Sequence, residues 1–206
     1  MSRYGDEQVL VIPRPLLDEL GSFQGLQFEV DRYLPTFLRP ENNFFMSRDT
    51  AEDDPSHKQI IPYAIFHHGG KFLHYVRGKK SGEQRLASKG SIGIGGHINT
   101  TDHSPEPLGE ETYLRGVERE VHEELKITDG FDQKIVALLN HDDNEVGRVH
   151  LGVVHLINLH SDNVVANESE IAELEFLSLE ELLECRDRLE SWSQSCVDGL
   201  DKILAL

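Results

Sequence analysis

The sequence predicts an α/β (α+β) protein in which a mixed β-sheet is sandwiched between helices. Two apolar runs, Ile60–His67 and Lys71–Val76, flank a Gly-Gly pair and predict a β-hairpin. The segment Glu110–Ile127 carries an apolar residue at every fourth position, which predicts an amphipathic helix. Strand and helix patterns then follow each other without a regular βαβ alternation, so a mixed sheet is favoured over a parallel one.

The remaining elements follow from the same periodicities. Residues 31–58 contain several proline, asparagine and acidic residues, and we expect irregular chain or short strands there. The elements expected outside the hairpin and the central helix are strands at Val9–Ile12, Lys134–Asn140, Val149–Leu159 and Leu174–Leu177, a helix at Leu16–Leu20 ending at Gly21, and helices from Leu179 onward.

The length of 206 residues fits either one domain of generous size or one domain with an extension. We expect residues 59–206 to form the main domain and residues 1–58 to form an N-terminal extension packed on it. Three roles stay open for this extension: completing the sheet, covering the site, or forming a homodimer interface.

The composition limits the classes of function. The chain has 20 Lys and Arg against 37 Asp and Glu, a net charge of −17, which argues against broad contact with a nucleic-acid polymer. The first 25 residues show no signal-peptide pattern, and no apolar run is long enough for a membrane span. With only two cysteines, Cys185 and Cys196, the sequence predicts a cytoplasmic protein without a disulfide framework.

Three acidic residues flank the apolar stripe of the central helix. The stripe consists of Tyr113, Val117, Val121 and Leu125, with Leu114 beside it. At about 100° per residue, Glu120, Glu123 and Glu124 fall within one arc roughly 100° wide. Such neighbours repel one another, and a divalent cation with oxygen ligands would remove that repulsion. On the wheel alone, an acidic solvated face is the commoner explanation.

The wider pattern changes that balance. Glu111-x7-Arg119-Glu120-Val121-x-Glu123-Glu124 is preceded by Gly95-Gly96 and followed by Ile127. This pattern resembles the Nudix box of the Nudix hydrolase (MutT-like) family, Gly-x5-Glu-x7-Arg-Glu-U-x-Glu-Glu-x-Gly-U, where U is bulky and apolar. Six defined positions agree between Glu111 and Glu124, and the order of predicted elements over residues 59–206 resembles the family fold.

The resemblance implies a metal-dependent hydrolase that cleaves a phosphoanhydride bond in a nucleoside-diphosphate-linked or related small molecule. It implies Mg²⁺ or Mn²⁺ as cofactor, held by Glu120, Glu123, Glu124 and the backbone carbonyl of Gly96. It also implies that Glu111 and Arg119 brace the loop against the helix. The catalytic set expected from the family is therefore Glu120, Glu123, Arg119 and Glu111.

The identity of the general base stays open, because family members differ in using a box glutamate or an acid from a later loop. Glu168 and Glu170 are the later-loop candidates, although a solvated acidic loop is the commoner explanation for them. His141-Asp142-Asp143 either reaches the site or turns the chain, and we favour the turn.

Two departures from the family pattern stand out. Fourteen residues, 97–110, separate Gly96 from Glu111 where the family has five, and this insertion predicts a loop over the mouth of the site. Lys126 replaces the last glycine of the box, which predicts that the helix runs on towards Asp129-Gly130.

Substrate phosphates need cationic or hydrogen-bonding partners, and one segment is rich in basic residues. We expect Arg77, Arg85 and, next to Gly96, His97 to contact phosphate. The basic cluster consists of Arg77, Lys79, Lys80, Arg85 and Lys89.

Two other functions remain as alternatives. The first is a catalytically silent Nudix-like sensor that binds a nucleotide, although such modules tend to lose box glutamates and all three are present here. The second is a prenyl-diphosphate isomerase, which resembles the same fold but needs a cysteine near the strands. Both cysteines lie in the predicted C-terminal helical region, so the hydrolase is favoured.

Overall fold

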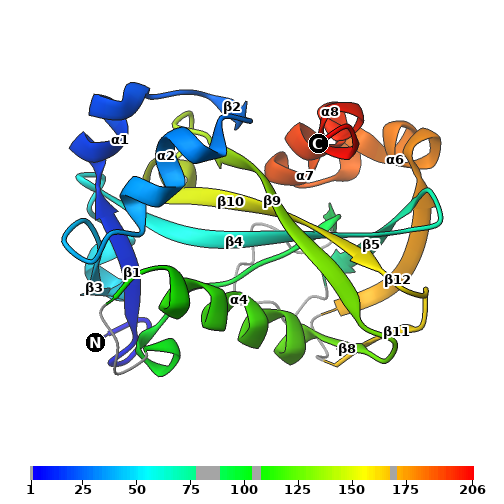
Figure 1. Cartoon of the computed structure of the whole chain (residues 1–206), viewed down its shortest axis with the longest axis horizontal. Helices are drawn as coiled ribbons and strands as arrows, with labels where there is room; N and C mark the ends of the chain where they lie inside the picture. Colours follow the sequence, from blue (N-terminus) through cyan, green and yellow to red (C-terminus); the bar gives the residue numbers. More distant parts are fainter. Residues whose placement is uncertain (1, 78–88, 104–107, 168–170) are drawn as a thin grey trace. The chain divides into compact units, whose positions relative to one another are not determined.

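Long strands and one long helix dominate the computed structural model, which describes residues 2–77, 89–103, 108–167 and 171–206 (Figure 1). In these ranges the strands are β1 (Gln8–Pro13), β2 (Gly25–Gln27), β3 (Phe44–Ser47), β4 (His57–His68), β5 (Lys71–Arg77), β6 (Gly90–Ser91), β7 (Gly93–Ile94), β8 (Leu125–Ile127), β9 (Phe131–Asn140), β10 (His150–Leu159), β11 (Val164–Ala166) and β12 (Ile171–Ser178). The helices are α1 (Arg14–Gly21), α2 (Val30–Phe37), α3 (Arg48–Ala51), α4 (Glu110–Glu124), α5 (Glu145–Val149), α6 (Leu179–Cys185), α7 (Ser191–Asp198) and α8 (Leu200–Leu204), with 3₁₀ turns at Thr100–Asp102 and Arg186–Arg188. The predicted mixed α/β class with a large sheet is confirmed.

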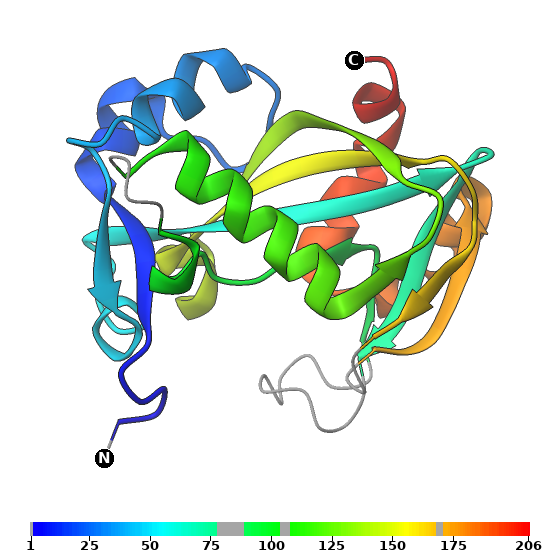
Figure 2. The same ribbon diagram turned by 60° about the horizontal axis from the view of Figure 1, so that its bottom comes forward.

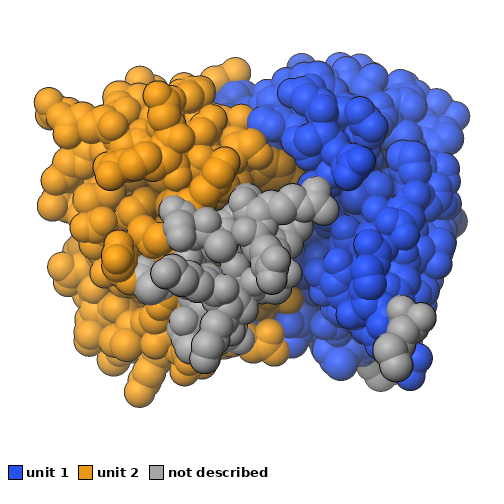
Figure 3. All heavy atoms as spheres, turned by 180° about the vertical axis from the view of Figure 1, so that it is seen from behind, with its two compact units in different colours: residues 1–62, 95–119, 137–153 blue, residues 63–94, 120–136, 154–206 orange. Residues whose placement is uncertain are grey.

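The chain divides into two compact units (Figure 3). Unit 1 consists of residues 1–62, 95–119 and 137–153, and unit 2 consists of residues 63–94, 120–136 and 154–206. Helix α4 and the strands β4, β9 and β10 each contribute residues to both units.

In unit 1 the N-terminal segment completes part of the sheet. Strand β1 pairs antiparallel with β3 on one side and with β4 on the other, so Val11 lies between Phe44 and Gln59. Antiparallel partners share a face of the sheet. The face that carries Val11 is covered by Ala51 at the end of α3.

In unit 2 the predicted hairpin is confirmed. His67 pairs with Phe72 and His68 pairs with Lys71. Gly69 and Gly70 connect the two strands with φ angles of 57° and 79°. Two consecutive positive φ angles are typical of the tight hairpin turn for which a Gly-Gly pair is suited. Strand β12 pairs with the other edge of β5.

Helix α4 ends three residues earlier than the sequence predicts (Figure 2). Leu125–Ile127 forms β8 and pairs with Val164–Ala166, so the expected extension towards Asp129-Gly130 is wrong. Leu125, the first residue of β8, is buried with Val121 in the apolar core of unit 2. Tyr113, Val117 and Val121 are buried as expected, but Leu114 is exposed.

Residues 31–58 are more regular than the sequence predicts. They contain most of α2, all of β3 and α3, and the start of β4. Helix α2 forms despite Pro35 in its interior, which costs about 3 kcal/mol. Burial of the Tyr33 and Phe37 side chains contributes about 2 kcal/mol each and offsets that cost.

No helix in the described ranges is both long and apolar enough to cross a bilayer.

Candidate functional site

The last two turns of α4 carry the three predicted metal ligands in unit 2. Glu120 and Glu124 are half-buried and Glu123 is exposed, while Val121 between them is buried in the core. Burial of Val121 fixes the rotation of the helix, so the neighbouring carboxylates lie at the boundary between core and solvent. We call Glu120, Glu123 and Glu124 the α4 carboxylates.

Asn167 holds the end of this helix. Its side-chain amide donates hydrogen bonds to the carbonyls of His122, at 3.2 Å, and Glu123, at 3.1 Å. Its backbone N–H donates to the carbonyl of Glu124 at 2.8 Å. The last carbonyls of a helix lack partners within the helix, so Asn167 stabilises the turn that carries two of the three carboxylates. Sequence reasoning missed this residue.

Arg119 is held within unit 1 by a carboxylate from the inserted segment. Its Nε donates to Asp102 Oδ1 at 2.7 Å, and its second guanidinium nitrogen donates to Asp102 Oδ2 at 2.9 Å. The same nitrogen donates to the backbone carbonyl of His97 at 2.9 Å. Such a two-pronged pair is among the strong side-chain interactions, and it ties the inserted segment to α4.

The inserted segment is ordered by its own capping box. Asn99 accepts a hydrogen bond from the N–H of Thr101, and Asp102 accepts one from the N–H of Asn99. Ile98 is fully buried, and a Cβ on Gly116 of α4 would lie 2.3 Å from its side chain. The first part of the insertion therefore packs closely on α4. The Asn-x-x-Asp spacing was the available sequence signal for Asp102.

Glu111 and Gly96 both belong to unit 1, and their expected roles remain predictions. Glu111 forms an exposed ion pair with Arg115 at 2.6 Å, and its predicted brace with Arg119 stays a prediction. Gly96 follows Gly95, where a Cβ would lie 2.2 Å from the carbonyl oxygen of Pro62. The backbone approaches its neighbour too closely there for any larger residue.

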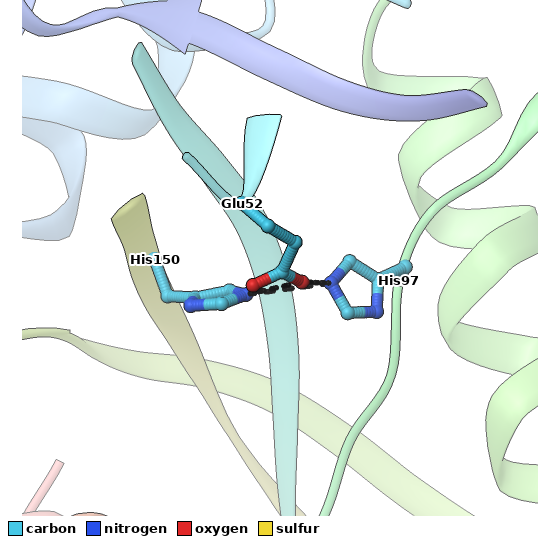
Figure 4. Close-up of side chains that lie close together, drawn as sticks. All are labelled: Glu52, His97 and His150. Carbon is cyan, nitrogen blue, oxygen red and sulfur yellow. Dashed lines mark hydrogen bonds and ion pairs between the residues drawn. The ribbon is translucent and has the colours of Figure 1, made fainter. Parts of the chain in front are cut away.

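His97 belongs to a cluster that the sequence did not indicate (Figure 4). In unit 1, His97 Nε2 lies 3.4 Å from His150 Nε2 and 3.7 Å from Glu52 Oε1. The distance from His150 Nε2 to the same Glu52 oxygen is 3.8 Å. Burial, together with the nearby Arg48, His150 and Arg119, lowers the pKa of His97 well below 6.5, so its imidazole is neutral at pH 7. We call Glu52, His97 and His150 the histidine cluster.

Asp142 lies in the loop after β9 and accepts hydrogen bonds from several side chains. It accepts a hydrogen bond at 2.7 Å from the ammonium of Lys58, which is fully buried. Burial alone would raise the pKa of Asp142, but bonds from Lys58, Asn140 and Gln24 outweigh it and lower the pKa to about 2. These hydrogen bonds anchor the loop after β9, so they give Asp142 a structural role in place of a catalytic one.

Four residues with predicted roles in binding phosphate or in catalysis lie wholly or partly outside the described residues. The backbone of Arg77 ends β5 opposite Ile171, but its side chain is not among the described ones. Arg85, Glu168 and Glu170 lie outside the described residues. Their expected roles therefore remain predictions.

Both cysteines lie in the C-terminal helical region, as expected. Cys185 ends α6 and Cys196 lies in α7, and both are free and buried. Neither of them lies in a strand.

Known proteins resemble this chain in sequence and in structure over almost its whole length. No protein-family model matches it. Protein YmaB of Bacillus subtilis (strain 168) is 35% identical over 204 residues, which cover 95% of this chain and 98% of YmaB. The crystal structure of Tm1382, assigned to the Nudix hydrolases, is 31% identical with a TM-score of 0.79 and covers 96% of this chain and 100% of Tm1382. The NUDIX domain of Shewanella oneidensis NrtR, solved with ADP ribose, shares the fold at 12% identity and a TM-score of 0.54, covering 71% of this chain and 88% of that one.

Proposed function

This chain belongs to the Nudix hydrolase family, and we propose that it uses Mg²⁺ or Mn²⁺ to cleave a phosphoanhydride bond in a nucleoside-diphosphate-linked or related small molecule. Membership in the family makes it a pyrophosphate-cleaving hydrolase in general. The observation that best supports a metal site is the placement of the α4 carboxylates on one side of a helix, at the boundary between core and solvent.

The α4 carboxylates fit the cation that the family uses. Mg²⁺ and Mn²⁺ prefer oxygen ligands, and three glutamates spaced i, i+3 and i+4 present theirs to one side of the helix. When bound there, such a cation lowers the pKa of a coordinated water and neutralises charge on phosphate oxygens. Two of the glutamates are half-buried, and a cation compensates their lost hydration.

The surrounding residues fix this arrangement. Asn167 holds the carbonyls of the last turn, and the Arg119–Asp102 pair holds the preceding turn against the inserted segment. Within this proposal a glutamate accepts the proton of the attacking water, either a box glutamate such as Glu120 or Glu123, or a later acid such as Glu168. Arg77, Arg85 and His97 are the proposed phosphate contacts.

The substrate class follows from chemistry rather than from a single relative. A pyrophosphate bridge between a nucleoside and a second group presents the anionic oxygens that cations and arginines bind. The NrtR domain was solved with ADP ribose, and this supports placing ADP ribose and related nucleoside diphosphates first in a substrate panel.

The test is a phosphate-release screen over pyrophosphate-linked metabolites, with Mg²⁺ or Mn²⁺ and an EDTA control. We expect turnover of at least one substrate that EDTA abolishes and added Mg²⁺ restores. Binding without turnover across the panel would contradict the hydrolase and favour the nucleotide sensor.

A further inference from the structure

The histidine cluster brings together three ligand-type atoms from segments far apart in the sequence. Glu52 follows α3, His97 lies in the segment after β7, and His150 begins β10. All three side chains belong to unit 1 and point toward one another (Figure 4). Their side chains are only 14%, 15% and 8% exposed, respectively.

The separations match those of ligands around one small ion. The three atoms form a triangle with sides of 3.4, 3.7 and 3.8 Å. A point equidistant from its corners lies about 2.1 Å from each, which is the length of a Zn–N(His) or Zn–O(carboxylate) bond. Small movements of the side chains would place the ion above this plane and leave a fourth position.

The tautomer of His150 is also suited to a metal. Its Nδ1 lies 2.7 Å from the carbonyl oxygen of Val146, and a carbonyl oxygen can only accept a hydrogen bond. Nδ1 therefore carries the proton, and in the neutral ring Nε2 presents its lone pair to Glu52 and His97. Histidine ligands of metals are typically oriented by such a bond from their other nitrogen.

Two polar side chains beside the cluster have atoms without hydrogen-bond partners among the described residues. Arg48 forms ion pairs with two carboxylates, through Nε to the same Glu52 oxygen at 3.5 Å and through a terminal nitrogen to Glu7 at 3.0 Å, but its Nε makes no hydrogen bond within the described residues. Gln59 is buried with neither amide atom bonded among the described groups. Its pairing with Val11 puts it on the sheet face that Ala51 covers, next in sequence to Glu52. A bound ion and its waters would give that amide a partner.

We propose that Glu52, His97 and His150 form a zinc site with no ligand from the α4 carboxylates, so that His97 binds the ion instead of making the phosphate contact named above. Two imidazole nitrogens and one carboxylate form a ligand set that Zn²⁺ prefers and Mg²⁺ does not. Such a set leaves at least one coordination position for water or for an oxygen atom of a ligand. The site joins α3, the segment after β7 and β10 within unit 1.

The test separates this site from the α4 carboxylates. In the full-length variant with Glu120, Glu123 and Glu124 all replaced by Gln, Zn²⁺ is titrated against a chromophoric chelator. We expect one equivalent to bind, and a further His150→Ala substitution to weaken binding by at least about 100-fold, since changes outside the ligand shell alone cost 10–100-fold. The matched control His103→Ala removes an exposed histidine of unit 1 and should leave the affinity unchanged.

Circular dichroism and the Tm of the metal-free proteins check that the variants fold. If His150→Ala does not fold, His97→Asn replaces it, and the visible spectrum of the Co²⁺-loaded protein shows whether nitrogen ligands are lost. Unchanged zinc affinity in the histidine variants would overturn the proposal. Loss of zinc binding in the triple Gln variant alone would also overturn it, because the ion would then belong to the α4 carboxylates, whatever the outcome of the hydrolysis screen.

Discussion

The α4 carboxylates and the histidine cluster are built in opposite ways. The carboxylates lie within five consecutive residues of one helix, so its periodicity alone places them on one side. The cluster draws one residue from each of three distant segments, and only the folded unit 1 brings them together. The comparison shows that the relative placement of side chains within one helix follows from its periodicity, whereas the meeting of side chains from distant segments does not.

The largest expected effect concerns the carboxylates. Glu123→Gln removes one negative ligand without changing side-chain size, and we expect kcat/KM to fall by about 1,000-fold, equivalent to about 4 kcal/mol. Steady-state hydrolysis at saturating Mg²⁺ measures it. Glu118→Gln, at an exposed position outside the acidic arc, is the matched control and should change the rate less than twofold. Wild-type rates in Glu123→Gln would contradict the assignment.

The next expected effect compares the stability contributions of two ion pairs made by arginines of α4, the buried Arg119–Asp102 pair and the exposed Arg115–Glu111 pair. Asp102→Ala removes the carboxylate that pairs with the Arg119 guanidinium, and we expect the free energy of unfolding to fall by about 3 kcal/mol, because Asp102 is only 3% exposed and Arg119 22%. Arg115→Ala breaks the Glu111 pair, half-exposed on both sides, and should cost at most about 0.5 kcal/mol. Urea denaturation of both variants checks the difference, and equal losses would contradict it.

The next expected effect is a dependence of stability on pH, caused by the buried His155 of β10. Burial lowers the pKa of His155 to about 4, and Gln133 contacts its ring at 2.8 Å. The unfolded chain takes up this proton near pH 6.5 and the folded chain only near pH 4. Stability is therefore full above pH 6.5 and falls by up to about 3 kcal/mol between pH 6.5 and 4. Urea titrations should show this loss in the wild type and a smaller one in His155→Gln, and identical pH profiles would contradict the buried, neutral state.

The smallest expected effect concerns the cap of α4. Asn167→Ala removes two side-chain hydrogen bonds to the last turn, and we expect a loss of about 1 kcal/mol in stability and less than a tenfold loss of hydrolysis. Asn163→Ala, which removes an exposed amide of the same unit, is the control and should be neutral. Thermal denaturation compares the two, and a larger loss in the control would contradict the role of Asn167.

The outcome of the sequence predictions follows the same division between local and distant contacts. The Gly69-Gly70 turn and the buried stripe of α4 depend on neighbouring residues, and both are confirmed. The end of α4 depends on pairing between Leu125–Ile127 and a strand that comes much later, so the predicted extension was wrong. Asp102 reaches Arg119 from the insertion, and only its capping motif was visible in the sequence.

The histidine cluster shows most clearly which contacts cannot be predicted from the sequence. His150 begins β10, but it meets Glu52, which lies in a region predicted to be irregular. No spacing rule connects residues that meet through the pairing of β1 with β4 and the packing of α3.

The central claim is that the α4 carboxylates hold the divalent ion, and direct ion binding tests it without assuming a substrate. Mn²⁺ is titrated into the wild type, the triple Gln variant of Glu120, Glu123 and Glu124, and His150→Ala, and free Mn²⁺ is followed by its paramagnetic resonance signal. The account predicts that the wild type and His150→Ala bind Mn²⁺ alike and that the triple variant binds at least about tenfold more weakly. Equal Mn²⁺ affinity in the wild type and the triple variant would contradict it.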